Sequence, residues 1–205
     1  MYTAAQADFT GRCTVPVLWD KQAHTIVNNE SADIIRMLNS AFDDLSGVSG
    51  ADYYPTALQS EIDTLNDRIY QDVNNGVYRC GFSRSQSAYD EAFDTLFATL
   101  DELDTRLTEQ RYLCGTQITE ADWRLFATLV RFDLAYHGQF KCNRQMLKDY
   151  AQLWPYCCDL YQQPGVAETV DVKAIKGIYY GSMGAGVLPK GPDLKFEAPH
   201  QRDKF

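Results

Sequence analysis

The spacing of hydrophobic residues changes along the chain from a strand-like to a helical pattern. Residues 14 to 19 are β-branched and aromatic, residues 20 to 24 form a polar turn, and residues 25 to 28 are again apolar. This alternation predicts a hairpin of two short strands. After Ser31 the apolar residues recur at helical spacing, at Ile34, Ile35, Leu38 and Phe42. We therefore expect a short amphipathic helix over 31 to 42, with Ser31 as its cap.

A stretch rich in glycine and serine, LSGVSGADYYP at 45 to 55, has no hydrophobic period and predicts a linker. Helical spacing follows it. One helix is expected to begin near Pro55 and to stop at Asn74-Asn75-Gly76, and a longer one to run from Tyr89 to Leu107. These two helices are expected to form an antiparallel pair in a bundle.

The third helix has the clearest start signal. In GTQITEADWRLFATLVRF, Thr119 and Asp122 occupy the N-cap and N3 positions, which is an acidic variant of the capping box. A fourth helix is expected over roughly Met146 to Tyr161, distorted at Pro155.

The pattern as a whole predicts a mainly α protein without internal repeats. A strand hairpin plus helix occupies 1–44, the linker 45–55, and an all-helical domain 56–188. The tail, 189–205, is too polar and too rich in proline to be expected to build a core.

Composition narrows the function classes. The formal charge of −9 disfavours nucleic acid and anionic lipid as partners. No window reaches the roughly 18 unbroken apolar residues of a membrane span. The first residues resemble no export signal, so we expect a cytoplasmic protein. The six cysteines include no CxxC and only three histidines accompany them, which indicates free buried thiols and no metal site.

The stretch VPVLWDKQAHTIVNNES at 15 to 31 suggests a binding site. A proline in a strand ordinarily marks an edge. If the bond before Pro16 were cis, however, the backbone of Val15 would face outward and could pair with an extended peptide. The Ser31 hydroxyl and the N–H groups of the helix start would hold a carboxylate, and Glu30 would accept from an ammonium group. A carboxylate and an ammonium on one carbon describe the γ-glutamyl end of glutathione.

An ordered set of motifs resembles one family. VPVLWD, NESADIIRMLNSAFD, VNNGVYRCGF, ITEADWRLFATLVRFD, FKCN and YQQPGVAETV are together similar to the glutathionyl-hydroquinone reductases, or Xi-class glutathione transferases. The resemblance runs from about Gly11 to Tyr180. It implies an all-helical glutathione-transferase C-terminal domain preceded by a partial thioredoxin-like hairpin and helix. It also implies glutathione as cosubstrate, no metal, and a homodimer that binds aromatic hydroquinone conjugates.

The resemblance also assigns residues. The glutathione contacts fall on Val15, Glu30 and Ser31. The tyrosines of the hydroquinone pocket match Tyr78, Tyr136 and Tyr179, which are expected to converge. Any single one of 13 tyrosines would more often be a core-edge residue whose hydroxyl is satisfied.

The family's nucleophile has no counterpart here. In the family, a cysteine in a Cys-Pro-Trp-Ala-like stretch removes glutathione from the conjugate, and a second glutathione resolves the mixed disulfide. None of the six cysteines is followed by proline, and nothing before Val15 could form the βαβ unit that carries that motif. We therefore expect a fragment, or a chain that has lost the chemistry, and in either case no activity from these 205 residues.

Two other side chains could be suggested as nucleophiles, and one other function is open. Cys13 follows a turn rather than opening a helix, so we do not expect it to replace the missing nucleophile. His24 lies in a turn without a Cys or Ser partner, and is expected to be solvated. The rival function is that of a non-catalytic module, a transferase-like helical domain that holds a ligand or associates with other proteins.

Overall fold

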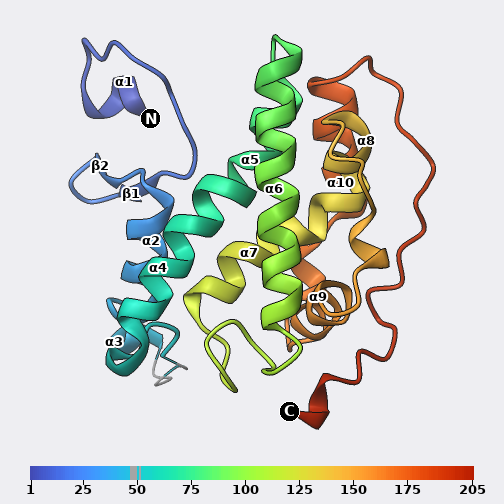
Figure 1. Cartoon of the computed structure of the whole chain (residues 1–205). Helices are drawn as coiled ribbons and strands as arrows, with labels where there is room; N and C mark the ends of the chain where they lie inside the picture. The colour runs from blue at the N-terminus through green and yellow to red at the C-terminus, as the bar shows by residue number, and fades with distance from the viewer. Residues whose placement is uncertain (47–49, 51) are drawn as a thin grey trace. The chain divides into compact units, whose positions relative to one another are not determined.

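The computed structural model describes residues 1–46, 50 and 52–205. The chain divides into two compact units, Met1–Pro55 and Thr56–Phe205 (Figure 1). The predicted linker over 45–55 lies partly outside the described residues, at 47–49 and 51.

The first unit contains the predicted hairpin. Its elements are α1 (Tyr2–Ala5), β1 (Leu18–Asp20), β2 (Thr25–Asn28), α2 (Ser31–Ser40) and α3 (Asp43–Ser46). The two strands are antiparallel, with Trp19 opposite Ile26 and Asp20 opposite Thr25, which confirms the hairpin. The first strand starts at Leu18, later than the expected residue 14, because Pro16 has no N–H to donate to a ladder. The Val15–Pro16 peptide bond is cis.

The start of α2 corrects one expectation. The N-cap residue is Glu30, whose carboxylate accepts from the Ala32 N–H at 3.4 Å, and Ser31 is the first helical residue. An acidic side chain one position earlier therefore satisfies the donor that Ser31 was expected to satisfy. The helix ends at Ser40 rather than at residue 42.

Local hydrogen bonds, rather than a core, organise the first unit. Ile34 is the one hydrophobic residue of this unit that is buried among the described residues. The Tyr2 hydroxyl donates to the Thr14 carbonyl at 2.9 Å, and the Asn29 side chain donates to the Tyr2 hydroxyl at 3.1 Å. Asn29 also donates to the Thr14 hydroxyl at 3.2 Å, so the segment before β1 is tied to the start of α2.

The second unit is helical throughout its regular elements. The longer helices are α4 (Gln59–Ile69), α5 (Gly76–Phe82), α6 (Gln86–Arg106), α7 (Glu120–Arg131) and α9 (Leu153–Tyr161). Shorter ones are α8 (His137–Gln139) and α10 (Val172–Lys176). Three π-helical turns lie at Tyr70–Asn74, Phe132–Tyr136 and Gly177–Ser182. Four 3-10 turns lie at Thr56–Leu58, Leu147–Asp149, Ala167–Thr169 and Arg202–Lys204.

The core lies between α4, α5, α6, α7 and α9, with the long α6 running alongside the other helices (Figure 1). Residues of the two predicted apolar stripes fill it, among them Ile62, Ile69, Leu96 and Leu100, each at most 1% exposed. The two expected helices are therefore present. None of the helices in the described part of the chain has the length and apolar composition that a membrane crossing requires.

The sequence predicted that the first bundle helix stops at Asn74-Asn75-Gly76, and this prediction is wrong. The chain widens into a π turn at Tyr70–Asn74 and then continues as α5. Gly76 is buried, and a side-chain carbon there would lie 3.6 Å from Leu96, an ordinary van der Waals distance. Just before it, the Asn74 side chain donates to the Arg124 carbonyl and to the Thr128 hydroxyl, so this polar residue is held within the bundle and does not mark the end of a helix.

The capping box of α7 is confirmed. The Thr119 N–H donates to Asp122 Oδ2 at 2.7 Å, and Thr119 is the N-cap. Asp122 also accepts from the Leu113 N–H at 2.8 Å and from the Tyr156 hydroxyl at 2.7 Å. Its carboxyl group thus connects the loop before α7 to α9. Burial raises the pKa of Asp122, and its hydrogen-bond donors oppose that rise.

The expected fourth helix is two elements, the 3-10 turn Leu147–Asp149 and then α9 from Leu153. Carboxylates of other elements start both pieces. Asp133 accepts from the Leu147 and Lys148 N–H groups, and Asp104 accepts from the Gln152 and Leu153 N–H groups. Pro155 lies in the first turn of α9, where its missing N–H costs nothing, so it does not distort the helix.

The tail also differs from expectation, because it contributes to the core. Phe196 is 4% exposed and its ring lies 4.9 Å from Tyr161 and 5.3 Å from Trp154. Arg202 is 1% exposed and donates to the carbonyl oxygens of Leu107, Gln110 and Arg111. A guanidinium group can be buried there because backbone acceptors satisfy its donors.

Candidate functional site

The three tyrosines singled out from the sequence converge in the second unit. The Tyr78 and Tyr179 hydroxyl oxygens lie 2.7 Å apart, and those of Tyr136 and Tyr179 lie 2.9 Å apart. The Tyr78 and Tyr136 oxygens are 3.5 Å apart. We call this group the hydroxyl cluster. The predicted convergence is confirmed, although 101 residues separate Tyr78 from Tyr179 along the chain.

Each tyrosine lies at or just after a π-helical turn. Tyr136 ends the turn that follows α7, Tyr179 lies in the turn that follows α10, and Tyr78 follows the turn that precedes α5. A π turn inserts one extra residue and rotates the side chains beyond it, and such turns are frequent at functional sites. The three turns thus aim hydroxyls from distant segments at one point.

Burial sets the chemistry of the hydroxyl cluster. Tyr136 is 2% exposed and Tyr179 is 7% exposed, while Tyr78 is half-buried. Burial raises the pKa of Tyr136, and it raises the pKa of Tyr179 to about 12. These two phenols therefore keep their protons at neutral pH. Since a hydroxyl both donates and accepts, the cluster can turn one O–H toward a ligand oxygen while the others remain paired.

Two phenylalanines complete the surroundings of the cluster. The Phe140 ring lies 5.3 Å from that of Tyr78 and 5.3 Å from that of Phe82. Phe82 in turn stacks on Tyr78 at 6.2 Å, and it is 59% exposed. An aromatic ligand that reached Tyr78 would therefore also meet the face or edge of an exposed ring.

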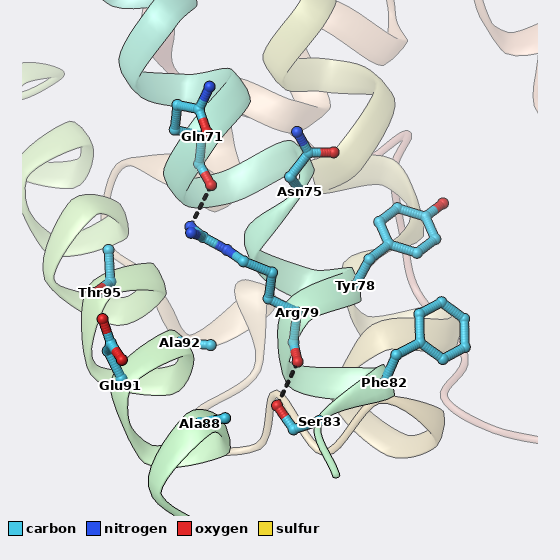
Figure 2. A pocket seen from close by; sticks show the side chains of 10 residues that line it. All are labelled: Gln71, Asn75, Tyr78, Arg79, Phe82, Ser83, Ala88, Glu91, Ala92 and Thr95. Atoms are coloured by element: carbon cyan, nitrogen blue, oxygen red, sulfur yellow. Dashed lines mark hydrogen bonds between the residues drawn. The ribbon is translucent and has the colours of Figure 1, made fainter. Parts of the chain in front are cut away.

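A cavity of about 700 Å³ opens beside Tyr78, between α5 and α6 (Figure 2). Tyr78 and Phe82 project from the same side of α5, whereas the lining residues of α6 lie on the other side, beyond Arg79 (Figure 2). Arg79 donates to the Gln71 carbonyl and lies 3.8 Å from the Asp72 carboxylate. Its charge is therefore partly neutralised within the wall.

A second cavity, of about 500 Å³, lies between α7 and α10 and includes Tyr179 in its wall. Its other residues are mostly apolar, with Arg131 and Asp171 as the charged members. Arg131 donates to the carbonyl of Ala127 one turn earlier. Both cavities therefore adjoin a tyrosine of the hydroxyl cluster.

The predicted glutathione contacts all lie on the surface of the first unit. Val15 is 89% exposed, and Glu30 and Ser31 are exposed. The hydrogen bond from Asn29 to Thr14 joins the residue before Glu30 to the residue before Val15. The structure thus brings the two predicted contact segments next to each other and leaves their side chains accessible.

The cysteines offer little as nucleophiles. Cys80, Cys114, Cys142, Cys157 and Cys158 are buried, and Cys13 is exposed. Burial raises the pKa of Cys114 to about 11 and that of Cys158 to about 12. Hydrogen bonding from Cys142 lowers the pKa of Cys80, but the Cys80 side chain is 0% exposed.

Groups that could hold a metal ion, with three or more His, Cys, Asp or Glu side chains, are absent from the part of the chain that the structure describes.

Sequence reasoning missed Phe82, Phe140, Arg79 and Arg131 as residues around the tyrosines. Phe82 and Arg79 belong to VNNGVYRCGF, and Phe140 opens FKCN, so the motifs that carried the family resemblance contained them. The available signal was the concentration of aromatic residues within a few positions of Tyr78 and Tyr136.

Comparisons with known proteins agree with this architecture. The family described as "Glutathione S-transferase, C-terminal domain" matches residues 86–157. The family described as "Glutathione S-transferase, N-terminal domain" matches residues 2–41.

Two curated relatives are glutathionyl-hydroquinone reductases. YqjG of Escherichia coli is 51% identical over 99% of this chain and 63% of its own length. PcpF of Sphingobium chlorophenolicum is 50% identical over 94% of this chain and 62% of its own length. The chain therefore spans a little under two thirds of the length of these relatives.

Solved structures extend the similarity to three dimensions. The glutathione-bound structure of YqjG superposes with a TM-score of 0.96 at 50% identity, covering 100% of this chain and 68% of that one. The Xi-class enzyme of Natrialba magadii gives a TM-score of 0.96 at 48% identity, covering 100% and 63%. With half of its residues identical to theirs and the same fold, this chain belongs to the glutathionyl-hydroquinone reductases, the Xi class of the glutathione transferases.

Proposed function

We propose that this protein binds glutathionyl-hydroquinones and takes part in their glutathione-dependent reduction to hydroquinones, with the hydroxyl cluster as the binding site of the aromatic ring. The observation that carries the proposal is the meeting of three tyrosine hydroxyls within 3.5 Å of one another, from three separate segments. Membership of the reductase family supports the same substrate class.

The cluster suits a hydroquinone because it offers O–H donors beside aromatic rings. In the family's reaction a thiolate attacks the glutathione sulfur of the conjugate, and the electrons of the carbon–sulfur bond move into the ring. A proton replaces the sulfur on the ring carbon, and the hydroquinone leaves. A phenol that donates to a ring oxygen stabilises the negative charge that develops there. Tyr136 and Tyr179 remain protonated donors, since burial raises the pKa of both.

Val15, Glu30 and Ser31 would hold the glutathione part of the conjugate. The exposed backbone of Val15 would pair with the peptide, Glu30 would accept from the ammonium group, and Ser31 would donate to the carboxylate. The E. coli relative has been solved with glutathione bound, which supports this ligand.

We further propose that these 205 residues do not turn over the conjugate by themselves. Five of the six thiols are buried, and Cys13 lies in an irregular segment rather than at the start of a helix. Turnover of glutathionyl-menadiol by the chain, abolished in Cys13→Ala, would contradict this. The homodimer implied by the family resemblance is likewise a proposal, to be tested by the solution mass of the chain.

Binding separates the roles of the two regions. Anaerobic titration calorimetry of the chain should detect glutathionyl-menadiol and, more weakly, glutathione. Tyr136→Phe should weaken binding of the conjugate by about fivefold, the value of one hydrogen bond of about 1 kcal/mol, and leave glutathione affinity unchanged. Tyr89→Phe, which removes a hydroxyl that instead donates to the Lys141 carbonyl, is the matched control. Equal affinity of wild type and Tyr136→Phe for the conjugate would refute the site.

A further inference from the structure

The ring of Phe140 packs against all three tyrosine rings of the hydroxyl cluster. Its centroid lies 5.3 Å from that of Tyr78, 5.5 Å from that of Tyr136 and 5.6 Å from that of Tyr179. It stacks on Tyr136 and meets the other two edge-on, which are favourable aromatic geometries. The Phe140 side chain is 3% exposed and carries no polar atom, so its contribution to the cluster is one of shape.

The backbone around Phe140 is fixed to the elements that carry the tyrosines. The Phe140 and Cys142 N–H groups both donate to the Tyr136 carbonyl, each at 3.1 Å. The Cys142 thiol points at the Val77 carbonyl, 3.9 Å away, in the residue before Tyr78. The segment therefore connects the π turn of Tyr136 with α5.

Gly81 supplies the space that this ring occupies. A side-chain carbon built at position 81 would lie 2.4 Å from Cγ of Phe140, far inside van der Waals contact. Its backbone is ordinary helix, so the conformational freedom of glycine is not what the position needs. The packing of the ring against α5 explains why a glycine lies in the interior of this helix.

We propose that Phe140 is a positioning residue for the hydroquinone site: its ring, seated in the space left by Gly81, holds the three tyrosine hydroxyls at mutual hydrogen-bonding distance. The consequence for hydroquinone binding rests on the proposed function, but the effect on the tyrosines does not. An ordinary core phenylalanine would stabilise the fold without governing the hydroxyls.

The test compares Phe140→Leu with Phe196→Leu. Both phenylalanines are buried, but the ring of Phe196 stacks on Tyr161 and packs at a tilt against Trp154, and not against the cluster. Tyrosine labelled with a carbon isotope at the phenol carbon allows each titration to be followed by NMR, with assignment by single Tyr→Phe changes. In wild type, Tyr179 should titrate at a pKa of about 12. In Phe140→Leu that pKa should fall toward 10, because water reaches the loosened cluster.

Phe140→Leu should also weaken binding of glutathionyl-menadiol by about fivefold and leave glutathione affinity unchanged, whereas Phe196→Leu should change neither. Gly81→Ala should reproduce the Phe140→Leu titration, since the added carbon displaces the ring. The double variant of Gly81→Ala and Phe140→Leu should lose less binding free energy for the conjugate than the sum of the two single losses. The reason is that the added carbon has no ring to clash with once Phe140 is replaced. If Phe140→Leu does not fold, Phe140→Met fills a similar volume without a ring and replaces it.

Two results would overturn the positioning role: a Tyr179 titration in Phe140→Leu identical to that of wild type, or an equal shift in Phe196→Leu. A shifted titration with unchanged affinity for the conjugate would support the positioning role of Phe140 and refute the proposed hydroquinone site instead. The two failures are thus distinguishable.

Discussion

The two units of the chain hold their predicted binding residues in opposite ways. In Met1–Pro55 the described residues include one buried hydrophobic side chain, Ile34, and the contact segments are joined by hydrogen bonds through Tyr2, Thr14 and Asn29. In Thr56–Phe205 the hydroxyl cluster lies among buried rings within a helical core.

The two proposed binding regions therefore differ in how much of their geometry is fixed before a ligand arrives. A cluster packed in a core has fixed geometry before a ligand arrives, so little ordering cost remains at binding. Exposed segments held by a few hydrogen bonds keep more conformational freedom and are ordered by the ligand itself. Under the proposed function, the aromatic end of the conjugate would meet a rigid region of the second unit, and its glutathione end an adaptable region of the first.

The largest expected effect concerns the carboxylate that connects elements of the second unit. Asp122→Ala leaves the Leu113 and Thr119 N–H groups and the Tyr156 hydroxyl without their acceptor. It should lower the free energy of unfolding by about 3–5 kcal/mol, measured by urea denaturation. The control is the exposed Asp94 on α6. Asp94→Ala should change the free energy of unfolding by no more than about 0.5 kcal/mol. Equal losses would show that Asp122 does not organise this unit.

A direct test of the comparison removes the same atoms from each unit. Ile62→Ala should cost about 2–5 kcal/mol of unfolding free energy, because Ile62 is 0% exposed within the helical core. Ile34→Ala should leave the main unfolding transition in place and increase hydrogen exchange within residues 1–46 only. If Ile34→Ala lowered the free energy of unfolding as much as Ile62→Ala, the two units would not differ in how they are stabilised.

The sequence predicted correctly those features of the fold whose signal is local, and it failed where a residue's partners are distant in the chain. The two strand-like segments located the hairpin, apolar periodicity located α6 and the capping box located α7, because each of these signals lies within or beside one element. The predicted end of the first bundle helix was wrong because the polar Asn74 is held within the bundle by the Arg124 carbonyl and the Thr128 hydroxyl, which belong to another helix. The prediction that the tail does not contribute to the core was wrong for the same kind of reason, since the acceptors of Arg202 are carbonyls some 90 residues earlier in the chain.

For the site, the resemblance to the family named the tyrosines, and the structure added their surroundings. Convergence of the tyrosines could be expected from motifs alone, but Phe140 is meaningful only once its ring is seen against all three. Sequence reasoning likewise took Ser31 as the cap of α2, and the structure corrects this to Glu30.

The buried Tyr179 should make the stability of the second unit depend on pH. The pKa of Tyr179 is raised to about 12 in the folded protein from an ordinary value of 10.0. The folded state therefore binds this proton more tightly, and the resulting stability is complete below pH 10 and is lost as pH rises to 12. The loss should be at most about 1.4 kcal/mol per pH unit. Urea denaturation of wild type and Tyr179→Phe across this window measures it, and a loss of the same slope in both would contradict the assignment to Tyr179.

The smallest expected effect lies at the start of α2. Glu30→Ala removes a helix cap and should cost about 1 kcal/mol or less, confined to the hydrogen exchange of α2. The same variant should reduce glutathione binding in calorimetry while the Tyr179 titration stays at its wild-type position. Unchanged glutathione affinity in both Glu30→Ala and Ser31→Ala would remove these residues from the proposed site.

The most direct measurement is a crystal structure of this chain with glutathionyl-menadiol, grown without oxygen. We expect a ring oxygen of the hydroquinone within about 2.7–3.2 Å of a hydroxyl oxygen of Tyr78, Tyr136 or Tyr179. The three hydroxyls should keep their mutual distances of 2.7, 2.9 and 3.5 Å within small shifts. A conjugate bound with its ring away from all three hydroxyls would show that the hydroxyl cluster is not the binding site of the hydroquinone.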